Sequence, residues 1–456
     1  MKRTLVLEAL KSIGQEIKAA GWVQIKRDHG KMVFIDLWDR TGILQVVGNK
    51  ELADLRPQDV VEITGLVKQR PAAMVNKKLA TGEIELEAKE VKVLASANEL
   101  PFDMGADDLR VELPTLLDWR ALSLRHPKAR AIFRVQETIV QAFREVLKID
   151  GFTEIQAPTI VPTITEGGAE VFKVKYFDKD AFLGQSPQLY KQIMVGVFER
   201  VFTLAHAYRA EPSVTARHLT EYLGLDAEMG FIESFQDIMD EAERVVRYIF
   251  QKLNKERSEE LKLFGAATPK LPAKIPCSKM REAQKIIFER TGRDNRQEPD
   301  LEPEDEKEIC RYAFEKYGSE LIFITHYPTK KRPFYTYPDP KDPEYTCSFD
   351  LLGRGLEWVT GGQRINDYQT LLEHVKKWGN KPADFELYLQ AFKFGMPQEG
   401  GFCLGAERIT MQILGLTNIR EASFFPRDME RIDQRLATIK PKSLVAKAKK
   451  IKNKLK

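Results

Sequence analysis

The amino-acid sequence predicts an α+β protein, in which a small five-stranded β-barrel precedes a larger domain of helices on an antiparallel sheet. Two observations favour this fold class. Five short runs of alternating apolar and polar residues come first. The strand-like and helical segments that follow lack the regular βαβ alternation of a parallel sheet. The 456 residues are enough for two or three domains.

The barrel prediction depends on strand-like runs that turn residues separate. The runs are GWVQIK (21–26), MVFIDLWD (32–39), ILQVVG (43–48), VVEITGLVK (60–68) and EIELEAKEVKVL (83–94). A period of two is typical of strands with one buried face. Five such strands within about 80 residues favour a closed barrel of the OB type. We assign residues 1–98 to this domain.

The second domain begins after a predicted linker. Residues 98–114 are rich in proline, glycine and acidic side chains, so we assign 99–125 to a hinge. Apolar residues recur every three or four positions over 127–149 and 235–256, which predicts two long amphipathic helices. Strand-like runs occupy 200–211, 223–232, 321–328, 345–362 and 399–409, the last opening a helix. This domain is predicted to span residues 126–436.

The C-terminal segment 437–456 is a lysine-rich tail. Residues 440–456 contain eight lysines and no acid. Removing these eight from the 71 basic residues leaves 63 against 67 acidic ones, so the tail alone makes the chain basic. Its lysines either solubilise a frayed terminus or contact phosphate groups.

Composition also indicates the cellular compartment in which the protein is expected. No run of 18 apolar residues occurs, so no membrane span is expected. The four cysteines lie far apart without CxxC spacing, which argues against a zinc site. Reduced thiols and the absence of a signal-like N-terminus favour a cytoplasmic protein.

Three groups of ionisable residues stand in apolar or glycine-rich surroundings. Arg209 and Glu211 lie two apart, Glu357, Thr360 and Arg364 surround two glycines, and Arg408 opens a helix. Buried charges require partners or a charged ligand. A glycine-rich backbone before a helix can cradle phosphate. Taken singly, an edge-strand salt bridge explains the first pair equally well, the second group is a weak magnesium signal, and tight strand–helix packing explains the third better than a phosphate site does.

Together these groups resemble the motifs of class II aminoacyl-tRNA synthetases. Arg209-Ala210-Glu211 with Arg217-His218 is similar to motif 2, and residues 404–408 to motif 3. GFTEIQAPTIVPT (151–163) is similar to motif 1. The stretches TEGGAEVF, GQSPQLYKQ and SFDLLGRGLEWVTGGQR resemble aspartyl-tRNA synthetases of the shorter archaeal and eukaryotic type. The interval between Glu228 and Asp350 is too short for the extra domain of the longer bacterial enzymes.

The resemblance implies a function. Members activate L-aspartate with ATP to aspartyl-adenylate and transfer it to the 3′ end of tRNA(Asp), and some also charge tRNA(Asn). It further implies Mg²⁺ as cofactor and a homodimer formed through motif 1. The alternative is a paralogue that keeps the ATP site but forms a free amide or only binds RNA. Such a paralogue is expected to lose the barrel or a motif arginine.

The resemblance also assigns site residues. Arg209 and Arg408 match the catalytic arginines, while Glu357 and Thr360 match the magnesium ligands. The aspartate-binding set is Glu166, Gln188, Leu189, Tyr190, Lys191, Arg209, Thr360 and Arg364. The ATP-binding set is Arg209, Ala210, Glu211, Arg217, His218, Leu219, Glu357, Gly405, Ala406, Glu407 and Arg408. Thr360 stands where the family usually has serine, which preserves the hydroxyl.

Substrate choice is expected to depend on Lys191 and Arg364. Two cations that face one carboxylate would lose their partner with asparagine and would repel lysine. The asparaginyl and lysyl enzymes share this architecture, but the asparaginyl family generally lacks the lysine at position 191.

In the barrel, Phe34 and Gln45 match positions that stack on and hydrogen-bond to anticodon bases. Phe34 as a plain core residue is the alternative. Gln24, two residues after the GW pair, favours an enzyme that charges only tRNA(Asp).

Overall fold

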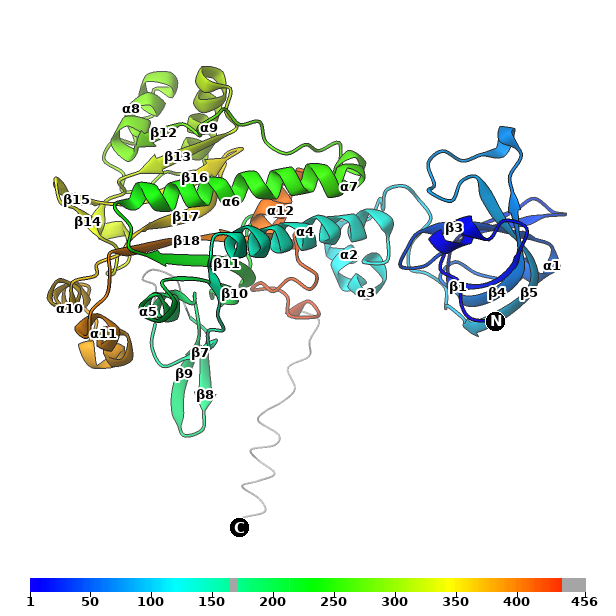
Figure 1. The fold of residues 1–456 in the computed structure, drawn as a ribbon, viewed down its shortest axis with the longest axis horizontal. Helices are drawn as coiled ribbons and strands as arrows, with labels where there is room; N and C mark the ends of the chain where they lie inside the picture. Colours follow the sequence, from blue (N-terminus) through cyan, green and yellow to red (C-terminus); the bar gives the residue numbers. More distant parts are fainter. Residues whose placement is uncertain (165–170, 213, 437–456) are drawn as a thin grey trace, which may run out of the picture. The chain divides into compact units, whose positions relative to one another are not determined.

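The computed structural model describes residues 1–164, 171–212 and 214–436 (Figure 1). It divides into two compact units, and the division falls between Leu116 and Leu117, inside the predicted hinge. The predicted site residue Glu166 and the tail 437–456 lie outside the described residues. None of the helices in those ranges is long and apolar enough to cross a membrane.

The first unit is a closed barrel with strand order β1-β2-β3-β5-β4, which confirms the OB-type prediction. Its strands are β1 (Glu16–Asp28), β2 (Val33–Trp38), β3 (Ile43–Gly48), β4 (Val60–Gln69) and β5 (Ile84–Ala95). Alternate residues such as Val33, Ile35 and Leu37 are buried in the barrel core. Short helices η1 (Leu7–Lys11), α1 (Lys50–Ala53) and η2 (Ala72–Met74) complete the unit.

The second unit contains an eight-stranded sheet with order β12-β13-β16-β17-β18-β11-β10-β6. The strands are β6 (Thr153–Glu154), β10 (Arg200–Tyr208), β11 (Glu221–Gly230), β12 (Cys277–Lys279), β13 (Leu321–Thr325), β16 (Ser348–Gly353), β17 (Leu356–Gln363) and β18 (Glu399–Gly405). Only the short edge strands β6 and β12 pair in parallel. The predicted α+β class with an antiparallel sheet is therefore confirmed.

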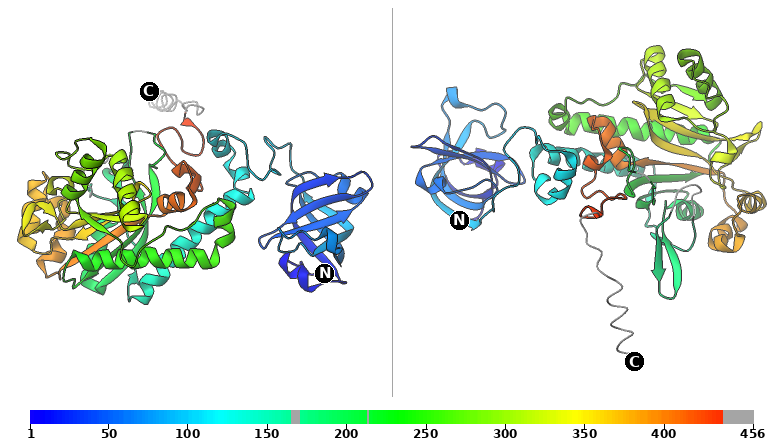
Figure 2. Two further views of the ribbon diagram at one scale, coloured as in Figure 1. Left: turned by 90° about the horizontal axis from the view of Figure 1, so that it is seen from above. Right: turned by 180° about the vertical axis from the view of Figure 1, so that it is seen from behind.

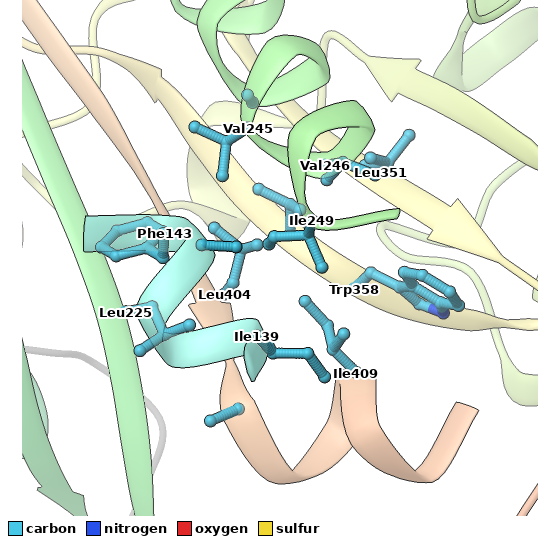
Figure 3. Close-up of a cluster of buried hydrophobic side chains, with 14 of the residues drawn as sticks. Ile139, Phe143, Leu225, Val245, Val246, Ile249, Leu351, Trp358, Leu404 and Ile409 are labelled. Carbon is cyan, nitrogen blue, oxygen red and sulfur yellow. The ribbon is translucent and has the colours of Figure 1, made fainter. Parts of the chain in front are cut away.

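Helices α4 (Pro127–Ile149), α6 (Phe235–Glu256) and α12 (Ala406–Leu414) cover one face of this sheet (Figures 1 and 2). Both long helices have the predicted bounds. Helix α4 ends where Gly151 adopts a φ of 78°. Figure 3 shows side chains from α4, α6 and α12 pointing toward residues of β11, β16, β17 and β18. This cluster fixes the sheet and leaves its other face for polar groups.

The opposite face is partly covered by smaller elements. Helices α8 (Met280–Thr291) and α9 (Pro303–Tyr317) pack on β13 and β16 through an apolar cluster of their own. Further helices are α2 (Leu113–Asp118), α3 (Arg120–Ser123), α5 (Gln188–Phe198), α7 (Ser258–Leu263), α10 (Tyr368–Lys377) and α11 (Glu386–Lys393). The 3₁₀ helices are η3 (Thr329–Lys331), η4 (Pro382–Phe385) and η5 (Ile419–Ala422). Small sheets pair β7 (Ile160–Val161), β9 (Lys179–Leu183) and β8 (Lys173–Tyr176), and β14 (Pro338–Asp339) with β15 (Asp342–Thr346).

Several predicted strands differ from the observed bounds, and two of these differences matter for the site. The run 200–211 ends as a strand at Tyr208, so Arg209 and Glu211 lie just beyond β10 and not within it. The run 345–362 is broken at Arg354 and Gly355, whose φ values of 49° and 81° form the tight turn between β16 and β17.

Candidate active site

A polar cavity of about 440 Å³ opens on the sheet face opposite α4 and α6. Its position follows from strand alternation. In β11, Leu225 and Ala227 enter the apolar core, so Asp226 and Glu228 point to the other face. Residues from β10, β11, β16, β17 and β18 and from the start of α5 meet there. The volume is that of a typical small-molecule site.

One end of the cavity holds a buried network of four ionised side chains. The Lys191 ammonium lies 2.9 Å from Asp226 Oδ1 and 3.0 Å from Glu228 Oε2. Arg364 donates from Nε to Glu228 Oε1 at 2.7 Å and from Nη2 to Oε2 at 3.3 Å. Relative exposure is 1% for Lys191, 0% for Glu228 and 6% for Arg364. Buried charges at these distances stabilise each other only as a set.

The network keeps its charges despite burial. Although desolvation alone would raise it, Arg364 and Lys191 hold the pKa of Glu228 below its usual value. The acidic neighbours Asp226 and Glu228 in turn raise the pKa of Lys191 above its usual value, against the effect of burial. Two cations and two carboxylates therefore balance before any ligand binds.

A glycine makes the central ion pair possible. A Cβ atom at Gly401 would lie 2.1 Å from Glu228 Oε2 and 2.1 Å from the carbonyl oxygen of Ala227. The missing side chain lets the Glu228 carboxylate reach across β18 to Arg364, which also donates to the Gly401 carbonyl oxygen at 3.1 Å. Gly401 therefore allows charged groups to pack closely, whereas a Cβ atom at the preceding Gly400 would meet Ile238 Cδ1 of the apolar core at 2.1 Å.

A second buried acid borders this network. Glu399 is fully buried and accepts a hydrogen bond from Gln192 Nε2 at 2.9 Å, while Tyr388 donates to Gln192 Oε1 at 3.1 Å. Burial and the nearby Glu228 carboxylate raise the pKa of Glu399 well above its usual value. Both effects favour the neutral, protonated form of Glu399.

The middle of the cavity is shaped by a β-bulge. Residues three apart on a regular strand face opposite sides, yet Glu357 and Thr360 both line the cavity. Leu351 pairs with Val359 and Leu352 with Glu357, so Trp358 is the extra residue of a bulge. The bulge turns the Trp358 side chain into the core and returns Glu357 to the polar face.

Thr360 is hydrogen-bonded to Asp350 and Arg332, two side chains to which the sequence assigned no role. Its hydroxyl donates to Asp350 Oδ1 at 2.7 Å and accepts from Arg332 Nη1 at 3.2 Å. Arg332 also donates to Asp350 Oδ2 at 2.8 Å. Partial burial and the nearby Asp350 carboxylate raise the pKa of Glu357, because both effects disfavour its charged form.

The other end of the cavity carries arginines and a histidine. Arg408 Nη1 lies 3.2 Å from Glu357 Oε1, and Arg217 Nη1 lies 3.2 Å from Glu306 Oε2. His218 Nδ1 lies 2.8 Å from the Thr215 hydroxyl. Burial and the neighbouring Arg408 lower the pKa of His218, so this ring is neutral at pH 7. Such a concentration of cations suits a polyphosphate.

Most of the predicted residues in the second unit come together here. Arg209 and Glu211 line the cavity beside Gln188, with the Arg209 guanidinium 5.6 Å from the Tyr222 ring centroid. Leu219, Gly405 and Glu407 line it too. Four predicted residues do not line it, namely Leu189, Tyr190, Ala210 and Ala406. Leu189 and Ala406 instead pack in apolar clusters, because the next residue along a helix faces another side.

The barrel carries the predicted base-binding residues on its outer face. Phe34 is half-buried and lies outside the core, with Arg27 and Val47 as its strand partners. Gln45 pairs with Asp36, which follows Phe34 by two residues on the same face of β2. Phe34 and Gln45 are therefore diagonal neighbours across the two strands. Gln24 is the extra residue of a bulge in β1 and is buried, with Oε1 unpartnered among the described residues. The alternative that Phe34 is barrel core is excluded.

Comparison with known proteins gives these two units a family. Residues 112–429 match the class II tRNA synthetases (D, K and N), and residues 17–94 match the OB-fold nucleic acid binding domain of the anticodon-binding type. The chain belongs to the class II tRNA synthetases. It is 44% identical over 431 residues to the aspartate–tRNA(Asp/Asn) ligase of Thermus thermophilus, covering 94% of this chain and 99% of the relative.

Two further relatives of this synthetase differ in the amino acid or tRNA they are named for. The aspartate–tRNA(Asp) ligase of Pyrococcus furiosus is 40% identical, with 92% of this chain and 96% of the relative covered. The structure of asparaginyl-tRNA synthetase from Pyrococcus horikoshii with asparaginyl-adenylate matches with a TM-score of 0.85 at 31% identity. That match covers 95% of this chain and 99% of the other.

Sequence patterns missed the acidic partners of the synthetase site. Asp226 and Glu228 were visible as unusual acids within an apolar run, but nothing in the sequence paired them with Lys191 and Arg364. Asp350 and Arg332 lie in segments that resemble the family, but no sequence pattern indicated what these two residues do. Their contacts join a helix or a loop to a strand, 35 residues apart for Lys191 and Asp226 and 18 for Arg332 and Asp350.

Glu407 of motif 3 gives a testable pH effect on stability. Its carboxylate accepts the Leu223 N–H at 3.1 Å, and burial raises its pKa to about 7. A raised pKa stabilises the folded state below about pH 4.5, and this stability is lost as pH rises through about 7. Glu407→Gln is therefore expected to raise the free energy of unfolding at pH 8 by about 1–3 kcal/mol.

Urea unfolding at pH 5 and pH 8 measures this effect. The exposed Glu386→Gln, at the start of α11, is the control and should change stability at neither pH. Equal destabilisation by Glu407→Gln at both values would contradict a protonated native carboxyl.

Proposed function

We propose that the chain is an aspartate–tRNA ligase that forms aspartyl-adenylate from L-aspartate and ATP and transfers the aspartyl group to tRNA. The single observation that carries this proposal is the buried Lys191–Asp226–Glu228–Arg364 network at one end of a cavity whose other end is lined by arginines. A small dicarboxylate at the first end and a nucleotide at the second fit these charges.

Selection of aspartate follows from the N–H donors of Arg364 that the buried ion pairs do not use. Glu228 and Asp226 fix the two cations, but the described residues leave Nη1 of Arg364 without an acceptor. A substrate carboxylate accepts from such donors at little reorganisation cost, because the ion pairs already hold them in place. The amide of asparagine would present an N–H₂ group to a cation and lose part of these bonds. Sites built for a polar partner reject such analogues by up to ~10⁴.

The chemistry requires positioning and charge neutralisation. The α-carboxylate of aspartate is ionised at neutral pH, so its attack on the α-phosphate needs no general base. Arg209 lines the same cavity as Lys191 and Arg408, so its guanidinium is proposed to contact both reacting groups. Arg408 and Arg217 neutralise the leaving pyrophosphate. Glu166 is proposed to bind the substrate amino group.

Mg²⁺ fits the donor set of Glu357, Thr360 and the additional acid Asp350. The repulsion that raises the pKa of Glu357 would be relieved by a divalent cation. No cluster of three His, Cys, Asp or Glu side chains suited to a metal occurs within residues 1–164, 171–212 and 214–436. Magnesium, however, commonly binds one or two carboxylates together with substrate phosphates. Bound there, it would neutralise phosphate charge.

The barrel is proposed to read the anticodon through Phe34 and Gln45. Phe34→Ala should raise the KM for tRNA by about 10-fold or more, because stacking contributes ~1–3 kcal/mol per base. Aspartate-dependent ATP–pyrophosphate exchange without tRNA should stay unchanged, since that reaction needs only the second unit. Phe34→Tyr keeps the ring and serves as the matched control. An unchanged KM for tRNA in Phe34→Ala would remove this residue from recognition.

A homodimer is proposed to form along α4. An open groove there is lined by Phe133, Val140 and Phe424, and the Phe424 ring is half exposed while it stacks on Phe133 at 3.7 Å. A second copy would bury these apolar groups. Sedimentation of Phe424→Glu should yield monomers where the unmodified chain yields dimers.

Two measurements test the function. ATP–pyrophosphate exchange should require aspartate and fail with asparagine or lysine; exchange with asparagine instead would favour the asparaginyl reaction. Charging of purified tRNA(Asp) and tRNA(Asn) then decides the tRNA range. The name of the Thermus thermophilus relative favours both tRNAs. A chain that exchanges pyrophosphate but charges neither would be the amide-forming paralogue.

A further inference from the structure

Helix α9 brings an acid to the arginine-rich end of the cavity. Glu306 lies in the first turns of this helix, which belongs to the segment between β11 and β16 and outside the three motifs. Its side chain is 15% exposed, and its Oε2 atom accepts from Arg217 Nη1 at 3.2 Å. An exposed surface pair would contribute little, but this pair is largely shielded from water.

Arg217 is held from a second side by the turn between β16 and β17. Its Nη2 group donates to the Gly355 carbonyl oxygen at 3.2 Å. Gly355 has a φ of 81°, and a Cβ atom at this position would lie 2.6 Å from Cγ of Lys307 on α9. The turn and the helix are thus packed against each other, and both contact the same guanidinium.

The placement of Glu306 is costly in electrostatic terms. Burial, followed by the nearby Glu357 carboxylate, raises the pKa of Glu306 to about 7, while Arg217 and Arg408 act in the opposite direction. Asp350 adds to the repulsion. A purely structural role would be met equally well by a neutral side chain. A carboxylate at position 306 is explained if Arg217 must be held in one orientation beside Glu357 and Asp350.

We propose that Glu306 is a positioning residue that orients Arg217 for the pyrophosphate portion of ATP. This inference rests on the proposed ligase function. Glu306 touches no reacting atom; it acts by keeping the Arg217 guanidinium turned toward the cavity and away from Glu357. The segment that contributes α9 therefore takes part in nucleotide binding through a single ion pair.

Glu306→Gln tests the proposal in ATP–pyrophosphate exchange. Above pH 7, where Glu306 is ionised, the KM values for ATP and for pyrophosphate should rise about 10-fold, because a charge-assisted hydrogen bond is replaced by a neutral one. The KM for aspartate and the kcat should stay within about twofold, which a general loss of structure would not produce. Glu304→Gln is the matched control, since Glu304 lies on the same helix and forms an ion pair at 2.7 Å with exposed Lys307.

A double-mutant cycle with Arg217→Lys separates positioning from other effects. Lysine keeps the charge but loses the fork that contacts Glu306 and Gly355 together. If Glu306 acts through Arg217, Glu306→Gln should add less than about twofold to the ATP KM of Arg217→Lys. Additive effects, a changed aspartate KM, or an equal effect of Glu304→Gln would overturn the proposal. Wild-type chain without aspartate-dependent exchange would instead overturn the ligase function itself.

Discussion

Arg364→Ala is expected to lower kcat/KM for aspartate in ATP–pyrophosphate exchange by roughly 10³-fold. The substitution removes the bidentate partner of Glu228, which has no solvent exposure. Removing one member of a buried ion pair costs about 3–5 kcal/mol, because the remaining charge stays desolvated. It also removes the Nη1 donor proposed for the substrate carboxylate. Both losses fall on the aspartate end of the cavity.

The affinity for ATP should change little in this variant, since Arg209 and Arg408 remain. Arg354→Ala is a suitable control, because Arg354 pairs with Glu320 at 3.0 Å and lies outside the cavity lining. Arg364→Lys should recover only part of the activity, as an ammonium cannot reproduce the fork. Aspartate activation at the normal rate in Arg364→Ala would contradict the assigned carboxylate site.

Arg209→Ala is expected to lower the rate of adenylate formation by about 10³-fold with a smaller effect on aspartate binding. Arg209 lines the same cavity as the aspartate network and the cations that are proposed to bind the nucleotide. A guanidinium that contacts charge developing in the transition state commonly contributes ~10²–10³ or more in rate. Single-turnover adenylate formation and calorimetric titration with aspartate measure the two effects separately.

Arg209→Lys is the control, because lysine keeps the positive charge but lacks the planar guanidinium fork. Partial recovery of the rate would indicate that positive charge contributes, and no recovery that the planar fork is required. A variant Arg209→Ala that loses aspartate binding completely, with normal single-turnover chemistry at saturation, would contradict a role at the reacting phosphate.

The local sequence was sufficient for several structural predictions. The apolar periodicity of residues 127–149 and 235–256 gave helices with the observed bounds, since an amphipathic helix carries its own pattern. The barrel strands followed from alternation and turn residues. Lys191 and Arg364 were found through motifs, and their presence at one end of the cavity agrees with that expectation.

Other features could not be predicted from sequence in the same way. The spacing of Glu357 and Thr360 implies opposite faces of a strand, and only the bulge at Trp358 brings them together. Leu189 and Ala406 were included because they lie within motifs, yet their side chains pack in apolar clusters. Asp350 is part of the site because it pairs with Thr360 across strands, and Arg332 because its loop brings it to Asp350. No local sequence pattern predicts either contact.

The sequence by itself determined the two kinds of domain, the long helices and the cations that mark this chain as a synthetase, because these depend on residue type and short spacing. The tertiary structure alone decided how each cation is neutralised. Lys191 meets Asp226 and Glu228, and Arg217 meets Glu306, across chain separations of 35 to 89 residues. The energy of a buried charge depends on its partners within a few ångströms, and only folding brings those partners there.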